Sequence, residues 1–193
     1  DVKYGDYYVM GVDLGKHEDF TVLTVINKIN NKVVFWERFR EINYPLQKLK
    51  IIALSKRYNN ARIIIDSTGL GDPISDDLKH EGLIVDDFKI SGKTKHQLVE
   101  KLIIFIEQQL VFIPEEEVLL DELESFSYEL TEKGNVRYSA PTGLHDDSVI
   151  SLALAVWGLV GGPVRDSFIK EIHKEPFKRE QPLGRQVVDR VII

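Results

Sequence analysis

Acidic residues stand at three places where the neighbouring sequence is apolar, and these residues are the best candidates for chemistry. Asp13 ends the run YYVMGVD, Asp66 ends the β-branched run ARIIID, and Asp146 and Asp147 open the run HDDSVISLALA. If the first and fourth strand-like segments are neighbours in one sheet, their carboxyl ends lie together. A helix packed at that edge then adds the third acidic position. We therefore expect these carboxylates to form one cluster.

Such a cluster needs a cation, because two unit charges about 5 Å apart at an effective dielectric of about 20 repel by roughly 3 kcal/mol. The chain has no cysteine and five histidines, so hard cations with oxygen ligands, Mg²⁺ or Mn²⁺, are the expected partners. Two such ions about 3.5–4 Å apart can activate a water molecule and stabilise the leaving oxygen of a phosphoryl displacement.

Each aspartate also has a simpler use. Asp13 is compatible with a turn after a strand, Asp66 with capping the loop STG, and Asp146 with capping a helix. Taken alone, each position favours this simpler use. It is the combination of two strand ends and one helix start that favours a metal site.

Composition is compatible with this interpretation. The 193 residues, 43% of them hydrophobic and 29% charged, are typical of one globular domain. No apolar run reaches the roughly 20 residues that a membrane span needs, and the N-terminus does not resemble a signal peptide. The net charge of −6 argues mildly against a nucleic-acid binder. Acidic residues that bind metal, however, lower the net charge without repelling a polyanion once the metal is present.

Hydrophobic periodicity predicts the elements that position the acidic residues. The order is three strands in an antiparallel meander, then alternating helices and strands, which indicates an α/β fold with a mixed sheet flanked by helices. Strands are predicted over residues 7–14, 20–27, 33–41, 62–66, 83–90 and 110–114, helices over 45–58, 73–81, 93–109, 115–126 and 144–162, and a hairpin over 127–143. We expect one domain over residues 1–162 and a tail over 163–193, either disordered or docked on a partner.

Four motifs in order give the chain a specific resemblance. The segments GVDLGKHEDFTVLTVI, IIIDSTGLGD, FKISGKTKHQLVEKL and GLHDDSVISLALA together resemble the C-terminal nuclease domain of the large terminase subunit of tailed bacteriophages. The resemblance covers roughly residues 5–160. It implies a ribonuclease H-like fold, akin to that of Holliday-junction resolvases, with three antiparallel strands followed by parallel strands. It also implies a metal-dependent endonuclease that cuts concatemeric viral double-stranded DNA with little sequence preference.

The resemblance also assigns roles to residues. Asp13 matches the first-strand ligand that bridges two ions, Asp66 matches the acid on the fourth strand, and the Asp146–Asp147 pair matches the acid on the last helix. Within that pair we favour Asp147 as the principal ligand. The weaker candidates for the metal site are Asp19 and His145. The candidate DNA contacts, made to phosphates rather than bases, are Lys93, Lys95, Lys133 and Arg137.

The family resemblance further implies partners and a location. The full-length subunit carries an N-terminal ATPase domain that this chain lacks, and it works with the portal and the small terminase subunit in the cytoplasm of the infected host cell, at the procapsid portal. Two alternatives within the fold are a structure-selective junction resolvase and a non-catalytic docking module of the packaging motor. An actin-like sugar kinase needs two large lobes, for which the chain is too short. The segment SGKT is not a P-loop, because Asp87 stands where that motif needs glycine.

Overall fold

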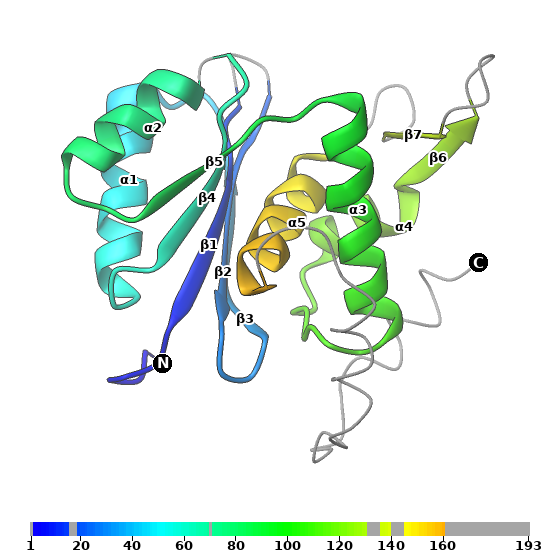
Figure 1. Ribbon diagram of the computed structural model, residues 1–193, viewed down its shortest axis with the longest axis horizontal. Helices are drawn as coiled ribbons and strands as arrows, with labels where there is room; N and C mark the ends of the chain where they lie inside the picture. Colours follow the sequence, from blue (N-terminus) through cyan, green and yellow to red (C-terminus); the bar gives the residue numbers. More distant parts are fainter. Residues whose placement is uncertain (1, 16–18, 70, 131–135, 140–144, 161–193) are drawn as a thin grey trace.

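The computed structural model describes residues 2–15, 19–69, 71–130, 136–139 and 145–160. Its centre is a five-stranded mixed sheet with the strand order β3-β2-β1-β4-β5, seen nearly edge-on in Figure 1.

The sheet has an antiparallel half and a parallel half, as predicted. The strands β1 (Tyr8–Asp13), β2 (Thr21–Asn27) and β3 (Lys32–Phe39) form the antiparallel meander. The strands β4 (Arg62–Asp66) and β5 (Val85–Phe88) then continue parallel to β1. The predicted ribonuclease H-like mixed sheet is therefore confirmed.

Helices cover both faces of the sheet (Figure 1). The helices α1 (Tyr44–Arg57) and α2 (Gly71–His80) lie on one face. On the other face, α5 (Asp147–Val160) contacts β1, β2 and β4, and α3 (Gly92–Glu107) packs on α5. We call the first the α1–α2 face and the second the α5 face. Beyond them lie α4 (Glu117–Ser125), which also contacts α5, and the hairpin of β6 (Ser127–Leu130) and β7 (Val136–Ser139).

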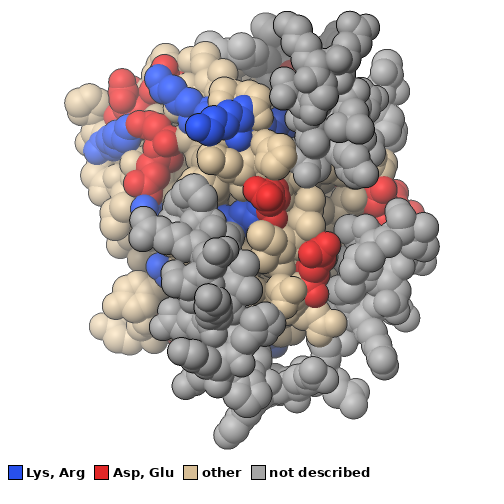
Figure 2. Space-filling model, turned by 45° about the vertical axis from the view of Figure 1, so that its right-hand side comes forward, with Lys and Arg blue, Asp and Glu red and all other residues tan. Residues whose placement is uncertain are grey.

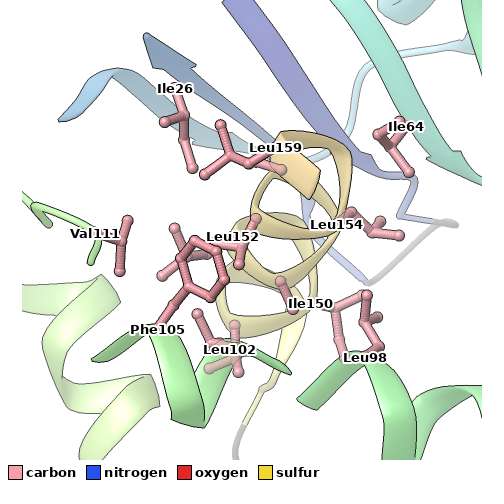
Figure 3. Close-up of a cluster of buried hydrophobic side chains, with 14 of the residues drawn as sticks. Ile26, Ile64, Leu98, Leu102, Phe105, Val111, Ile150, Leu152, Leu154 and Leu159 are labelled. Atoms are coloured by element: carbon pink, nitrogen blue, oxygen red, sulfur yellow. The ribbon is translucent and has the colours of Figure 1, made fainter. Parts of the chain in front are cut away.

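The continuous apolar run of β4 follows from burial on both faces. Side chains alternate across a strand, so Ile63 and Ile65 belong to the core under α1 and α2, whereas Ile64 belongs to the core around α5. In that second core, Leu152 and Ile150 of α5 face the helix α3, as Figure 3 shows. The helix α5 is apolar nearly all round because it lies between the sheet and α3.

The strand β1 and the helix α5 meet backbone to backbone. A Cβ atom added to Gly11 would lie 2.0 Å from the carbonyl oxygen of Ser151 and 2.5 Å from the amide nitrogen of Ala155. On the helix side, a Cβ atom on Gly158 would lie 2.4 Å from Val9. Glycine is therefore required at Gly11, where the neighbouring atoms are backbone, whereas at Gly158 the neighbouring atom belongs to a side chain. The contact at Gly11 holds β1 at a short separation from α5.

Some predicted bounds are corrected. The predicted strand over residues 110–114 is wrong, because only Phe112 pairs there, in a single parallel bridge with Lys32. Two residues later Pro114 has no N–H group with which to extend a ladder. The last helix begins at Asp147 rather than at 144, and α2 begins at Gly71 rather than at 73.

Parts of the chain that carried predictions lie outside the described residues. They are the turn of the hairpin, residues 131–135, and the proposed tail, residues 163–193. No helix in the described part of the chain is long and apolar enough to cross a bilayer.

Candidate metal centre

Two aspartates end neighbouring parallel strands. Val12 pairs with Ile65 in the β1–β4 ladder, so Asp13 and Asp66, the next residues, emerge side by side at the carboxyl edge of the sheet. Both residues are partly buried. Thr68 holds the Asp66 carboxylate, whose Oδ1 accepts hydrogen bonds from the Thr68 amide at 2.9 Å and from its hydroxyl at 2.6 Å.

The start of α5 brings the second pair of aspartates to this edge. The carbonyl oxygen of Asp146 accepts the first helical hydrogen bond, from the amide of Ile150 at 2.9 Å, and Asp147 is the first residue of the helix. One turn further on, the Ser151 hydroxyl lies 3.1 Å from the carbonyl oxygen of Gly11 and 2.9 Å from the Thr24 hydroxyl. These contacts anchor the first turns of α5 to β1 and β2.

The electrostatics of Asp13 indicate that the four carboxylates converge. Its pKa is raised well above the usual value, first by burial and then by the charges of Asp147, Asp66 and Asp146, while Lys95 acts in the opposite direction. The three acidic residues that raise this pKa come from two separate elements besides β1. The charges of Asp147, Asp66 and Asp146 therefore all act on Asp13 at this edge of the sheet, and their joint role as metal ligands stays a prediction.

Asp147 is also in an environment that disfavours its charge. Burial raises its pKa to about 6, and the charge of Glu122 adds to this, followed by smaller contributions from Asp146 and Asp19, while His145 opposes the shift. The Oδ2 atom of Asp147 is buried and accepts no hydrogen bond. An unpartnered buried carboxylate oxygen is costly in a folded protein, unless a cation completes it.

Lys95 supplies a positive charge inside the cluster. Its Nζ lies 2.8 Å from Oδ2 of Asp146, and both side chains are about three-quarters buried. Lys95 was predicted as a contact to DNA phosphates, and that role stays a prediction; in the structure its ammonium group lies beside a predicted metal ligand. The charge of Asp146 is thus already partly balanced by a lysine.

The two weaker candidates lie beside Asp147. His145 is exposed, with Nδ1 3.5 Å from Oδ2 of Asp147 and its ring edge-on to Phe20 at 5.1 Å. Asp19 is exposed, and its charge acts on the pKa of Asp147. Gly15 lets the turn close, because a Cβ atom there would lie 2.4 Å from the carbonyl oxygen of Asp19.

Of the other predicted DNA contacts, only Lys93 has a described side chain. Lys93 is exposed in the first turn of α3. Lys133 lies outside the described residues, and of Arg137 only its place in β7 is described. On the face shown in Figure 2, basic and acidic side chains are interspersed at the upper left, and isolated acidic side chains stand among neutral residues nearer the centre. The described part of this face has no continuous basic surface.

Sequence reasoning missed Glu122 and Arg38. Glu122 is 7% exposed on α4, and its Oε1 lies 3.1 Å from a terminal guanidinium nitrogen of Arg38 on β3. The sequence could have pointed to Glu122, because it lies on the same buried face of α4 as Leu119 and Leu123. A charged residue at an apolar position of an amphipathic helix marks a buried ion pair or a functional contact.

The carboxylate oxygens of these aspartates are suitable ligands for a hard cation, but in this structure they are not arranged around a common point. No three His, Cys, Asp or Glu side chains in the described part of the chain are placed to hold a metal ion together. The contacts explain this, since Asp146 is bound to Lys95 and Asp66 to Thr68. The carboxylate oxygens, their mutual repulsion and the unpartnered Oδ2 of Asp147 nevertheless match the oxygen ligands and negative charge that Mg²⁺ or Mn²⁺ requires.

The chain is similar in sequence to two phage proteins. The chain is 34% identical over 149 residues to the large terminase subunit of Thermus virus P23-45, an alignment that covers 77% of this chain and 31% of that protein. The large terminase subunit of Thermus phage G20c is 33% identical over the same shares. The chain thus spans about a third of the length of these relatives.

Solved structures of large terminase nucleases are similar to this chain in fold as well. The large terminase nuclease of phage G20c with bound magnesium has a TM-score of 0.76 and 32% identity, over 81% of this chain and 83% of that one. A second structure of the G20c nuclease contains bound cobalt. The large terminase nuclease domain of Thermus phage P74-26 has a TM-score of 0.73 and 31% identity, over 80% of both chains. The family model for the terminase RNaseH-like domain matches residues 10–156, and the chain therefore belongs to this family, as the nuclease domain of a large terminase subunit.

Proposed function

We propose that this domain is a divalent-cation-dependent endonuclease, which cuts concatemeric viral double-stranded DNA with little sequence preference when genome packaging begins and ends. One observation carries the proposal: Asp13 and Asp66 end neighbouring parallel strands, and the charges of Asp66 and of the two aspartates at the start of α5 raise the pKa of Asp13. A fold that concentrates negative charge in this way gains stability and function when a cation binds.

Asp13, Asp66 and Asp147 would hold the cations, with Asp146 as an additional ligand and Asp19 and His145 at the margin. Bound there, divalent cations activate a water molecule for attack on a DNA phosphate and stabilise the leaving oxygen. The protein's own part is to fix these side chains, since β1, β4 and α5 are rigid elements that are packed against one another. We propose two ions, Mg²⁺ or Mn²⁺, which these residues would hold; the magnesium in the G20c nuclease supports the choice of a hard cation.

The DNA backbone would be held by lysines at the rim of the cluster. Lys95 already lies inside it, 2.8 Å from Asp146, and Lys93 is exposed two residues earlier on α3. Lys133 and Arg137 of the hairpin segment remain proposed contacts. Binding through phosphates predicts that DNA affinity falls steeply as salt rises.

The wider setting is a proposal as well. Since the chain spans 31% of its curated relatives, we propose that the nuclease is joined to an N-terminal ATPase domain in the full-length protein. It would act with the portal and the small terminase subunit, at the procapsid portal in the cytoplasm of the infected host cell.

The test is plasmid cleavage with Mg²⁺, with Mn²⁺ and with EDTA, on the wild type and on Asp13→Asn and Asp66→Asn. Asp77→Asn is the matched control, because this exposed aspartate pairs with Lys48 on the α1–α2 face. We expect cleavage only with a cation, loss of cleavage in the first two variants, and an unchanged rate in the control. Undiminished cation-dependent nicking by both Asp13→Asn and Asp66→Asn would refute the proposed site.

The choice of substrate separates the alternatives. An endonuclease of the packaging type cuts linear duplex DNA at least as well as a four-way junction of the same length. A strong preference for the junction would indicate a resolvase instead. Binding of DNA without any cleavage, under all cation conditions, would indicate a docking module.

A further inference from the structure

A buried acid from a neighbouring helix caps the start of α5. The Oε2 atom of Glu122 on α4 accepts a hydrogen bond from the amide of Ser148 at 2.8 Å. Ser148 is the second residue of α5, and first-turn amides have no partner within their own helix. A carboxylate at this end also interacts favourably with the helix dipole. Glu122 thus performs for α5, from 26 residues away, the capping that is usually local.

The local residue that would normally do this is engaged elsewhere. Asp146 occupies the position just before the helix, and aspartate is among the preferred capping residues there. Its carboxylate, however, lies 2.8 Å from Lys95. Because Glu122 caps the helix, the side chains of Asp146 and Asp147 do not have to turn back towards the amides of their own helix.

The other oxygen of Glu122 connects α5 to the sheet. Oε1 lies 3.1 Å from Arg38 on β3, and the guanidinium group of Arg38 lies over the ring of Phe20 at 3.4 Å. Phe20 contacts His145 edge-on at 5.1 Å, and His145 immediately precedes the acidic pair. The first turn of α5 is therefore held from two directions, through Ser148 and through this chain of contacts.

Glu122 differs from an ordinary cap in the element that it comes from. A serine or threonine at the helix start would satisfy the same amide from within the same segment. Glu122 belongs to α4, and its Oε1 lies 3.1 Å from Arg38 on β3, so its bond to Ser148 fixes the first turn of α5 relative to both α4 and the sheet. Glu122 therefore provides placement of the acidic pair.

We propose that Glu122 is a positioning residue, which holds the first turn of α5 so that Asp146 and Asp147 face the cluster instead of capping their own helix. The inference rests on the proposed function, because it concerns the cation ligands. Residues that orient metal ligands typically change metal affinity or activity 10–100-fold when they are replaced. Glu122 would therefore act on cation binding without touching the cation.

Two substitutions separate reach from charge. Glu122→Asp keeps the charge but withdraws the carboxylate by one methylene group, so that the bond to Ser148 is lost. Glu122→Gln keeps the reach and an acceptor oxygen but removes the charge. The matched control is Glu37→Gln, which breaks an ion pair with Lys50 of α1 on the opposite face of the sheet.

The measurement is the dissociation constant of Mn²⁺ by isothermal titration calorimetry, without DNA, with thermal melts of each metal-free protein. We expect Glu122→Asp to weaken Mn²⁺ binding about tenfold or more, Glu122→Gln to stay within about threefold of the wild type, and Glu37→Gln to bind as the wild type does. A purely structural cap would lower the melting temperature of Glu122→Asp and leave its Mn²⁺ affinity unchanged.

The outcomes that overturn the inference differ from those that overturn the proposed function. Wild-type affinity in Glu122→Asp contradicts positioning, and so does a larger loss in Glu122→Gln than in Glu122→Asp, which would indicate that the charge itself attracts the cation. If the wild-type protein does not bind Mn²⁺ at all, the proposed function fails, and the inference fails with it.

Discussion

The acidic residues on the two faces of the sheet have opposite environments. On the α1–α2 face, Asp77 pairs with Lys48, and a hydrogen bond from that lysine lowers its pKa. Beside α5, the pKa values of Asp13 and Asp147 are raised instead. On the α1–α2 face the folded protein stabilises the charged form of the carboxylate, whereas beside α5 burial and neighbouring carboxylates destabilise it. The difference separates carboxylates whose charge stabilises the fold from carboxylates whose charge the fold disfavours.

The two faces also pack differently. The helices α1 and α2 rest on the sheet through side chains such as Ile51, Leu54 and Leu78. The helix α5 contacts β1 through backbone atoms at Gly11. Positions on the α5 face therefore have less freedom to adjust, and this contrast gives the following predictions.

The largest effect is expected for Gly11→Ala. The added methyl group would lie 2.0 Å from a carbonyl oxygen of α5, so the helix must move. Overpacking of this kind typically costs about 1–3 kcal/mol and here should reach the upper end or exceed it. Urea denaturation measures the loss, and Gly92→Ala, where nothing lies within 4 Å of the added atom, is the control and should stay within about 0.5 kcal/mol. A loss as small as that in Gly11→Ala would disprove the close contact.

Asp13→Asn should stabilise the protein in EDTA at neutral pH. The substitution removes an acid whose charged form is disfavoured by burial and by the charges of Asp147, Asp66 and Asp146, so the gain should be on the order of 1 kcal/mol. Thermal melts with and without Mn²⁺ provide the check. The wild type should gain stability from the cation, and Asp13→Asn should gain much less. If Asp13→Asn melted at a lower temperature than the wild type in EDTA, Asp13 would be an ordinary structural acid.

The buried side chain of Lys101 should make the stability of the protein depend on pH. This lysine of α3 is 1% exposed beside Trp157, and burial lowers its pKa from 10.5 to about 8. Between about pH 8 and 10.5 the unfolded chain therefore binds more protons than the folded one, so Lys101 makes stability rise with pH in this window. The contribution should be about 1 kcal/mol or more. Lys101→Met removes this contribution. The urea midpoints of both proteins are measured from about pH 8 to 10.5, and the change in their difference with pH reports the titration of Lys101 alone. Parallel pH profiles would contradict the shift.

The smallest effect is expected for Asp87→Asn, the counterpart of Asp13→Asn on the other face. Burial alone would raise the pKa of Asp87, but hydrogen bonds from Lys79 and Ser75 outweigh it and lower the pKa. Above about pH 4 the charged form therefore stabilises the fold, and this contribution is lost as the pH falls through the lowered pKa. The substitution should cost about 0.2–1 kcal/mol, the value of a surface ion pair. A gain in melting temperature would remove the contrast between the faces.

The sequence was sufficient for the sheet and for the proposed acidic cluster. The three consecutive isoleucines before Asp66, without polar alternation, favour a parallel strand that is buried on both faces. Once β1 and β4 are neighbours, the carboxyl ends of both strands must lie together. The acidic pair at the start of α5 was predictable in the same way, because an apolar helix of that length has to pack on the sheet.

Contacts between side chains that are distant in sequence were not predictable. Lys95 and Asp146 are 51 residues apart, and nothing in either segment indicates that a proposed DNA contact would bind a proposed metal ligand. Glu122 could have been noticed on the apolar face of α4, but not its partner, the amide of Ser148. Residues 110–114 have strand-like composition, yet only Phe112 finds a strand to pair with.

The close packing of α5 on β1 has a consequence for the order in which the protein folds. The acidic residues of the cluster come from the first strand, the middle of the domain and its last described helix, and α5 joins them through contacts that span up to 140 residues. Long-range contacts of this kind form late in folding. A chain still emerging from the ribosome has Asp13 and Asp66 but no complete cluster, until α5 has been synthesised and has packed on the sheet.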